Sequence, residues 1–358
     1  MFKALRHANA IWSSLVSLAM LTLLFLLLQK SLLTMAITCE DVKGKGSGSV
    51  FSVEELKSLS LLDEDGIKEC IIILGKEPLT KEQSSTVWSA LIDIYKSVDD
   101  IPQDSLQHLG WIANGIRQEH FYNLSLTEVD TIAAFGKLSW LNQEQLQNLN
   151  AAVFEQWSSK EIEDLSSYDL MNLRQILCAF NESEILKIHP DAYKDAAQEL
   201  ATLTNCTKEV IAGLAELATS PLAFGNPKNW TSLHIATIGC IMGGLPSVKV
   251  IPPSAMEGLT KSTLACLPPS VLQEMSDEQI SNLSPSAAGS LSTKQLSALY
   301  KSQKYALQLA IKALSMNTFE LMTVPNGKNI CISSASPNSC ALKKRTTSEL
   351  QLIEFEEM

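Results

Sequence analysis

The sequence predicts an all-α protein, a superhelical array of short capped helices that forms an armadillo-like α-solenoid. A helix-start pattern recurs, in which a Ser, Thr or Asn precedes an acidic or amide residue and then apolar residues three and four apart. The starts follow one another closely, since sixteen residues separate Leu146 from Ile162 and again Ile280 from Leu296. A segment of that length holds one short helix and a turn, which is stable only when packed on neighbouring helices. Strict alternation of apolar and polar residues, the sign of a strand, is almost absent.

The helix starts can be placed in order along the chain. The pattern begins at Ser52, Thr80, Asn142, Ser159, Ser276 and Ser292. The first side-chain oxygen is expected to accept from a free backbone N–H of the first turn, and a Glu or Gln three residues on can reach back to the cap. Residues 69–75 form an apolar run that could be a buried strand. No partner run follows it, so a helix ended by Gly75 is predicted there.

The chain divides into four segments by composition. Lys3 and Arg6 precede an apolar stretch over residues 11–28, so residues 1–36 are predicted to be a secretory signal peptide, cleaved after Ala36, or an uncleaved membrane anchor. Residues 37–50 contain several Gly and Ser and are predicted to be a flexible linker. Residues 51–315 are expected to form the helical array, and residues 316–358 a loosely ordered polar tail.

Five Asn-x-Ser/Thr sequences follow the signal segment and support entry into the secretory pathway. Their asparagines, which we expect to carry N-linked glycans, are Asn123, Asn181, Asn205, Asn229 and Asn282. Chance alone produces such a triplet often, but five of them behind a signal segment favour a glycoprotein. The Pro285 that follows the last triplet weakens it as an acceptor.

Eight cysteines, an even number in an oxidising compartment, favour disulfide bonds. Spacing favours a bond between Cys178 and Cys206, because the stretch between them holds one helix and two turns. The same spacing favours Cys240 with Cys266, and a small loop in the tail would be closed by Cys331 with Cys340. The alternative is that Cys178 and Cys240, each on an apolar face, are simply buried thiols.

The composition argues against several classes of function. The net charge is −11, from 28 basic and 39 acidic residues, and no basic stripe is present, so a nucleic-acid partner is not expected. The five histidines are scattered, no HExxH pair occurs, and no CxxC motif is present, so we expect no metal and no cofactor. No nucleophile, base and orienting residue can be grouped from motifs, and we expect that the protein is not an enzyme.

The segments that carry the helix pattern resemble the mesothelin, otoancorin and stereocilin family over roughly residues 60–315. The likeness is densest in residues 108–113, 127–133, 178–183, 224–232, 264–268, 276–285 and 291–296, and is closest to the C-terminal region of otoancorin. The resemblance implies a superhelix of short helices in a non-enzymatic glycoprotein of cell adhesion. Family members such as otoancorin end in an apolar tail for a lipid anchor, whereas residues 351–358 are acidic and polar. Membrane attachment is therefore expected only through residues 11–28.

Together these features predict a cell-surface or secreted glycoprotein that mediates cell adhesion or cell–matrix attachment through the surface of its helical array. Its expected partner is a cell-surface or extracellular-matrix protein or glycan. The alternative is a secreted binding protein for an apolar small molecule. A contiguous exposed apolar or aromatic patch would favour attachment, and a closed apolar pocket would favour the small ligand.

Overall fold

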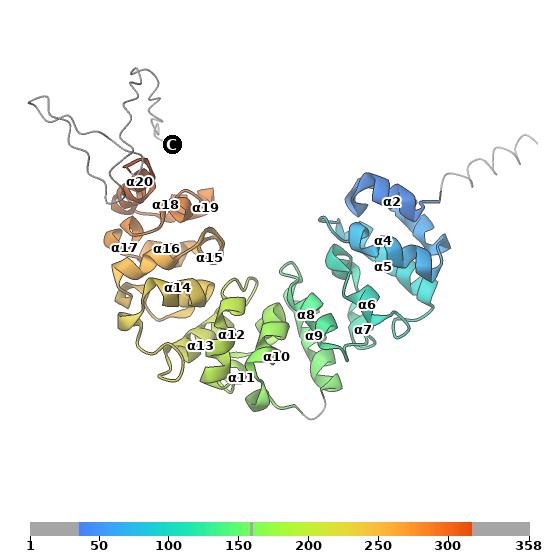
Figure 1. Ribbon diagram of the computed structural model, residues 1–358, viewed down its shortest axis with the longest axis horizontal. Helices are drawn as coiled ribbons and strands as arrows, with labels where there is room; N and C mark the ends of the chain where they lie inside the picture. The colour runs from blue at the N-terminus through green and yellow to red at the C-terminus, as the bar shows by residue number, and fades with distance from the viewer. Residues whose placement is uncertain (1–35, 158–159, 317–358) are drawn as a thin grey trace, which may run out of the picture. The chain divides into compact units, whose positions relative to one another are not determined.

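The computed structural model describes residues 36–157 and 160–316, and this part of the chain consists of α-helices and short 3-10 helices (η) without any strand (Figure 1). The predicted all-α class is therefore confirmed. The signal segment 1–36, apart from Ala36, and the tail after Met316 lie outside the described residues, so the predictions made for them stay predictions.

The helices follow one another at short intervals. The first group comprises α2 (Cys39–Lys45), η1 (Gly48–Val50), α3 (Val53–Lys57), η2 (Ser58–Leu61), α4 (Glu64–Leu74), α5 (Lys81–Tyr95), α6 (Gln103–Leu106), η3 (Gly110–Gly115) and α7 (Gln118–Phe121). The second comprises α8 (Val129–Gly136), α9 (Gln143–Gln156), η4 (Ile162–Asp164), α10 (Ser167–Leu173), η5 (Arg174–Ala179), α11 (Glu182–Ile185), α12 (Pro190–Leu200), α13 (Lys208–Thr219) and η6 (Pro227–Asn229). The third comprises α14 (Ser232–Ile238), η7 (Gly239–Gly244), η8 (Val248–Val250), η9 (Pro253–Gly258), α15 (Lys261–Cys266), α16 (Pro269–Glu274), α17 (Asp277–Ser281), α18 (Pro285–Ala288), α19 (Thr293–Ala298) and α20 (Lys301–Met316).

Five of the six predicted helix starts are confirmed as capping boxes. In these boxes the cap oxygen accepts from the N–H three residues on, and the Glu or Gln there accepts from the cap N–H. The caps are Ser52, Thr80, Asn142, Ser276 and Ser292. At the start of α9, for example, the N–H of Gln145 donates to Asn142 Oδ1 at 2.9 Å.

The sixth predicted start differs from the structure. Ser159 lies outside the described residues, and the apolar residues after it form only the 3-10 turn η4. The next α-helix, α10, is capped by Ser166 in a box with Asp169. The physical reason is that Ile162 stands three residues after Ser159, where a capping box needs a side chain that can accept a hydrogen bond.

The predicted flexible linker over residues 37–50 is not what the structure contains. Helix α2 begins after Thr38, which forms a capping box with Asp41, and η1 follows it. Gly46 has a φ of +75° and caps the C-terminus of α2, which explains a glycine there without any need for a flexible chain. The side chain of Val42 is fully buried, so this segment belongs to the core.

The helices pack mainly on their next-but-one neighbours. Helix α8 contacts α6 and α10, α10 contacts α12, and α12 contacts α14. In a second row α9 contacts α7 and η5, while α13 contacts α11 and η7. The buried side chains of these helices, most often Leu and Ile, form one connected core from Ile37 to Ala310. Helices of four to sixteen residues gain their stability from this burial, since such short segments are marginal in isolation.

Buried glutamines add polar links between these neighbours. The Nε2 group of Gln279, at the third position of α17, donates to the carbonyl oxygens of Val248 and Ile251 at 2.8 Å each. Gln295 and Gln303 make the same kind of bridge to carbonyls 28 and 31 residues earlier. In each case the Oε1 atom accepts from a backbone N–H at the start of its own helix. One side chain therefore caps its own helix and ties it to backbone carbonyls 28 to 31 residues earlier in the chain.

Gly239 marks a place where two backbones approach closely. Its φ is +56°, and the N–H of the next residue, Cys240, donates to the carbonyl of Ala201 at 2.8 Å. A Cβ atom on residue 239 would overlap that carbonyl. The glycine thus permits both the left-handed backbone and the close contact between η7 and the end of α12.

Candidate functional site

The histidines considered as catalytic or metal-binding candidates are engaged in local structure. His120 Nδ1 accepts a 2.8 Å hydrogen bond from Trp88 Nε1, and burial, followed by the charge of Arg117, lowers the pKa of His120. His234 Nδ1 accepts from the N–H of Thr231 in the capping box of α14. Within residues 36–157 and 160–316, no three His, Cys, Asp or Glu side chains are grouped so that they could hold a metal ion.

All five asparagines of the predicted glycosylation sites lie exposed at the surface. Asn123 follows α7, Asn181 caps α11, Asn205 precedes α13, Asn229 ends η6 and Asn282 follows α17. The structure distributes them over the chain rather than bringing them together. Exposure of each site is the condition that a glycan needs, because an attached sugar is bulky and hydrated.

The two helix-spanning disulfides favoured by the spacing are present in the structure. Cys178 in η5 is bonded to Cys206, with 4.3 Å between their Cα atoms. Cys240 in η7 is bonded to Cys266 at the end of α15, with 5.8 Å between their Cα atoms. Cys178 and Cys240 are both buried, but as halves of disulfides and not as the free thiols of the alternative interpretation. The predicted pair of Cys331 and Cys340 lies outside the described residues.

A hollow of about 400 Å³ lies beside these disulfides, and most of the residues that line it have polar side chains. We refer to it as the polar hollow; it is lined by Gly136, Lys137, Ser139, Arg174, Gln175, Glu199, Thr202, Leu203, Thr204, Ser262, Ala265 and Cys266. The lining comes from the end of α8, from η5, from the end of α12 with the loop after it, and from α15. Hydroxyls, amides and charged groups outnumber the apolar side chains and the hollow is open to solvent, so it is not the closed apolar pocket that the alternative function would need.

Hydrogen bonds hold the loop between α12 and α13 at the rim of the polar hollow. The N–H of Thr204 donates to Gln175 Oε1 at 3.2 Å, and Asn205 Nδ2 donates to the carbonyl oxygen of Ser139 at 2.6 Å. Arg174 and Glu199 form an ion pair across the lining. With the bond from Cys206 to Cys178, the loop is attached on both sides, which gives the hollow a defined shape.

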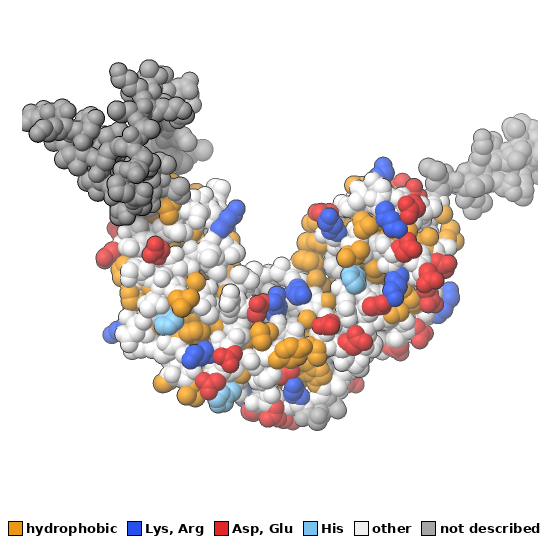
Figure 2. Space-filling view, viewed as in Figure 1, with side chains coloured by type: hydrophobic (Ala, Val, Ile, Leu, Met, Phe, Trp, Pro, Cys, Tyr) orange, Lys and Arg blue, Asp and Glu red, His pale blue; other side chains and the backbone are white. Residues whose placement is uncertain are grey.

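A cluster of aromatic rings lies where α9 ends. Phe154 contacts Trp157 and Phe180 edge to face, with ring centroids 5.8 and 5.7 Å apart, and we call these three residues the aromatic cluster. Lys160 lies over the Trp157 ring at 5.1 Å and pairs with Asp169 of α10 at 2.7 Å. Figure 2 shows hydrophobic side chains gathered near α9 and α10 on the face drawn, with Lys and Arg interspersed among Asp and Glu elsewhere on it.

Comparison with known proteins identifies the relatives of this chain, although no family model matches it. Human otoancorin is 26% identical over 241 residues, which is 64% of this chain and 20% of otoancorin. Mouse otoancorin is 27% identical over 241 residues, again 64% of this chain and 21% of otoancorin. The chain is related to otoancorin. This relation confirms the resemblance inferred from the motifs. The chain spans about a fifth of the length of the otoancorins that it matches.

The two disulfides are typical of a protein from an oxidising compartment, such as an extracellular or cell-surface protein. Among the residues that the structure describes, no helix has the length and apolar character needed to cross a bilayer. The apolar stretch over residues 11–28, which was predicted as a signal peptide or anchor, lies outside them.

Two features of this otoancorin relative had no counterpart in the sequence analysis. The polar hollow joins residues from Gly136 to Cys266, and no local pattern indicates which side chains four separate elements will bring together. The glutamine bridges, in contrast, are indicated by a feature of the sequence. The residue at the third helical position is Gln and not Glu at 83, 145, 279 and 295, and only an amide can donate to a neighbouring carbonyl.

Proposed function

We propose that this relative of otoancorin is a non-enzymatic glycoprotein, at the cell surface or secreted, that mediates cell adhesion or cell–matrix attachment. Its helices would form an armadillo-like superhelical array, with a cell-surface or matrix protein or glycan bound along one side of it. The observation that carries the proposal is the match to otoancorin over 241 residues, since the resemblance to that family implies attachment.

The packing of the helices supports an array with a long surface. Contacts between next-but-one helices, with glutamine bridges at separations of 28 to 31 residues, are the repeated interactions from which solenoids are built. Such architectures present extended faces more often than deep reactive clefts. Attachment also needs only modest affinity at each contact, because many copies on one membrane raise the avidity.

Two surface features suit a macromolecular partner. The polar hollow offers hydroxyl, amide and amine groups, which can form hydrogen bonds with a sugar or a peptide. The aromatic cluster offers Trp157 next to a cation, and Trp is among the residues that most often dominate binding energy at interfaces. We propose that the partner contacts the array through one or both of these features.

A coated-surface assay tests the proposal. The full chain, secreted by animal cells with its disulfides intact, is coated on wells, and retention of cells or matrix is measured. We expect retention above that of the same protein reduced and unfolded, and a loss in the Lys137→Glu variant, which reverses an exposed charge at the polar hollow. Lys194→Glu, a charge reversal at another exposed lysine, on α12 and outside the hollow, is the matched control.

Two outcomes would contradict the proposal. Equal retention by the folded and the unfolded protein would remove specific attachment. Turnover of a substrate that is abolished by a single His, Cys, Asp or Glu substitution would show that the protein is an enzyme.

A further inference from the structure

Two free cysteines lie on neighbouring helices at the start of the described chain. Cys39 is the first residue of α2 and Cys70 lies in α4, and these two helices pack against each other. Both side chains are buried, with 8% and 0% of their surfaces exposed. The other four cysteines that the structure describes are all in disulfides.

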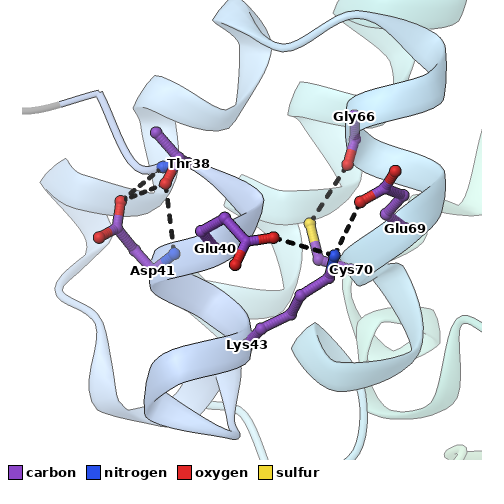
Figure 3. Close-up of polar contacts among 7 residues, drawn as sticks. All are labelled: Thr38, Glu40, Asp41, Lys43, Gly66, Glu69 and Cys70. Atoms are coloured by element: carbon purple, nitrogen blue, oxygen red, sulfur yellow. Dashed lines mark hydrogen bonds and ion pairs between the residues drawn. The ribbon is translucent and has the colours of Figure 1, made fainter.

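An ion pair beside the two cysteines joins α2 to α4. Lys43 of α2 lies between Glu40 of its own helix and Glu69 of α4, with its Nζ 2.8 Å from Glu69 Oε2 (Figure 3). Cys39 is one helical turn before Lys43 and therefore on the same face of α2, while Cys70 directly follows Glu69. The two thiols are neighbours, and the Cys70 thiol donates to the carbonyl oxygen of Gly66 in its own helix at 3.5 Å (Figure 3).

The sequence separation of this pair matches that of the other cross-links. Cys39 and Cys70 are 31 residues apart, whereas the two disulfides join residues 28 and 26 apart. The bridges made by Gln279 and Gln295 span 28 to 31 residues. All of these links therefore join segments of the chain that lie 26 to 31 residues apart.

Helix α4 also lacks the polar link that later helices have. Gly66 stands at its third position, where α17 and α19 have a bridging glutamine, and a glycine has no side-chain donor. The ion pair between Lys43 and Glu69 is largely exposed and contributes little to stability. A covalent bond would fasten α2 to α4 at the position where the glutamine bridge is missing.

We propose that Cys39 and Cys70 form a third disulfide bond in the secretory pathway. The oxidant is the disulfide of a thiol–disulfide oxidoreductase, R–S–S–R′. One cysteine thiolate attacks it, releases R′–SH and leaves a mixed disulfide, which the second thiolate then attacks, so that the Cys39–Cys70 bond forms and R–SH leaves. Two thiols are thus oxidised, one disulfide is reduced, and both thiol protons end on the released thiols.

The bond is expected to form while the chain folds. Burial raises the pKa of the Cys70 thiol, and the neighbouring Cys39 thiol raises it further. A thiol of this kind has little thiolate in the folded protein and no access to an oxidoreductase. Oxidation therefore precedes the docking of α2 on α4.

Peptide mapping of the full chain secreted by animal cells tests this proposal. The protein is unfolded in guanidinium with iodoacetamide and no reductant, and is then digested with trypsin. We expect a peptide ending at Lys43 and containing Cys39 to be linked to residues 69–76, which contain Cys70. The linked peptides of Cys178 and Cys206 in the same digest are the control that native disulfides survived.

A thiol count on a matched variant gives a second readout. If the bond exists, unfolded wild type and the Cys39→Ala/Cys70→Ala double variant contain the same number of free thiols. Two fewer free thiols in the double variant, alkylation of both Cys39 and Cys70 in the wild type, or a bond from either to another cysteine would each overturn the proposal.

Discussion

The side-chain amide of Gln279 donates a 2.8 Å hydrogen bond to the carbonyl oxygen of Ile251, a residue 28 positions earlier in the chain. The same Nε2 group also donates to Val248, and the Oε1 atom accepts from the N–H of Ser276 at 2.9 Å. Because the side chain is 1% exposed, water cannot replace these partners. A residue that reads as an ordinary helix cap is therefore also a link between segments of the core.

Gln279→Glu separates these two roles of the side chain. A glutamate keeps the acceptor for the Ser276 cap but turns a carboxylate oxygen toward two carbonyl oxygens. We expect a loss of about 2 kcal/mol or more in the free energy of unfolding, since a buried charge would lack a donor. Urea denaturation measures it. The exposed Gln198→Glu in α12 is the control and should change stability by less than about 0.5 kcal/mol. Equal effects at both positions would contradict the bridging role.

Gly239→Ala should destabilise the protein, whereas Gly44→Ala should not. Residue 239 has a φ of +56° and a Cβ there would overlap the carbonyl of Ala201, so we expect a loss of about 1–3 kcal/mol. Gly44 lies within α2 with open space around it, and alanine there should stabilise the helix by roughly 0.5–1 kcal/mol. Thermal denaturation of both variants gives the comparison. A neutral Gly239→Ala would show that the backbone can relax at this contact.

The contact between Trp88 and His120 should make stability depend on pH. Burial and the charge of Arg117 lower the pKa of His120, so the folded state binds its proton less readily than the unfolded state does. The contribution of neutral His120 to the free energy of unfolding is therefore fully present above the ordinary histidine pKa of about 6.5. It is lost as the pH falls below that value. Protonation also removes the Nδ1 acceptor that Trp88 uses.

The measurement is the urea midpoint at pH values from above 7 to about 5, a range that includes the ordinary histidine pKa. His120→Gln keeps an acceptor for Trp88 but does not titrate, so its midpoint should fall less over the same range. An identical pH dependence in the wild type and in the variant would assign the effect to other groups.

Glycans should be found on at least three of the five exposed asparagines when the chain is made in animal cells. Enzymatic removal of N-glycans should then lower the apparent mass by several kilodaltons, and single Asn→Gln variants should each remove one glycan. At Asn205 a glycan leaves one N–H on Nδ2, which can still donate to Ser139. An unchanged mass after treatment would contradict entry into the secretory pathway.

Much of this fold could be predicted from local patterns. A capping box lies within four residues, so Ser52 or Asn142 reveals a helix start whatever surrounds it. The partners Cys178 with Cys206 and Cys240 with Cys266 followed from spacing, because one short helix and its turns set the distance between neighbouring segments. The signal segment, the five Asn-x-Ser/Thr sequences and the eight cysteines favoured a secretory glycoprotein, and the two disulfides agree with an oxidising compartment.

Other features, such as whether residues 37–50 form a linker or a helix, were decided only by the tertiary structure. The residues around Gly46 are typical of a linker. They nevertheless form α2, because the side chains of Cys39 and Val42 are buried where α2 packs against α4. The second role of Gln279, the overlap that excludes a side chain at Gly239, and the lining of the polar hollow all depend on groups from distant segments. The physical reason is that capping and helical periodicity act within one or two turns of chain, whereas burial and close approach depend on which segments meet.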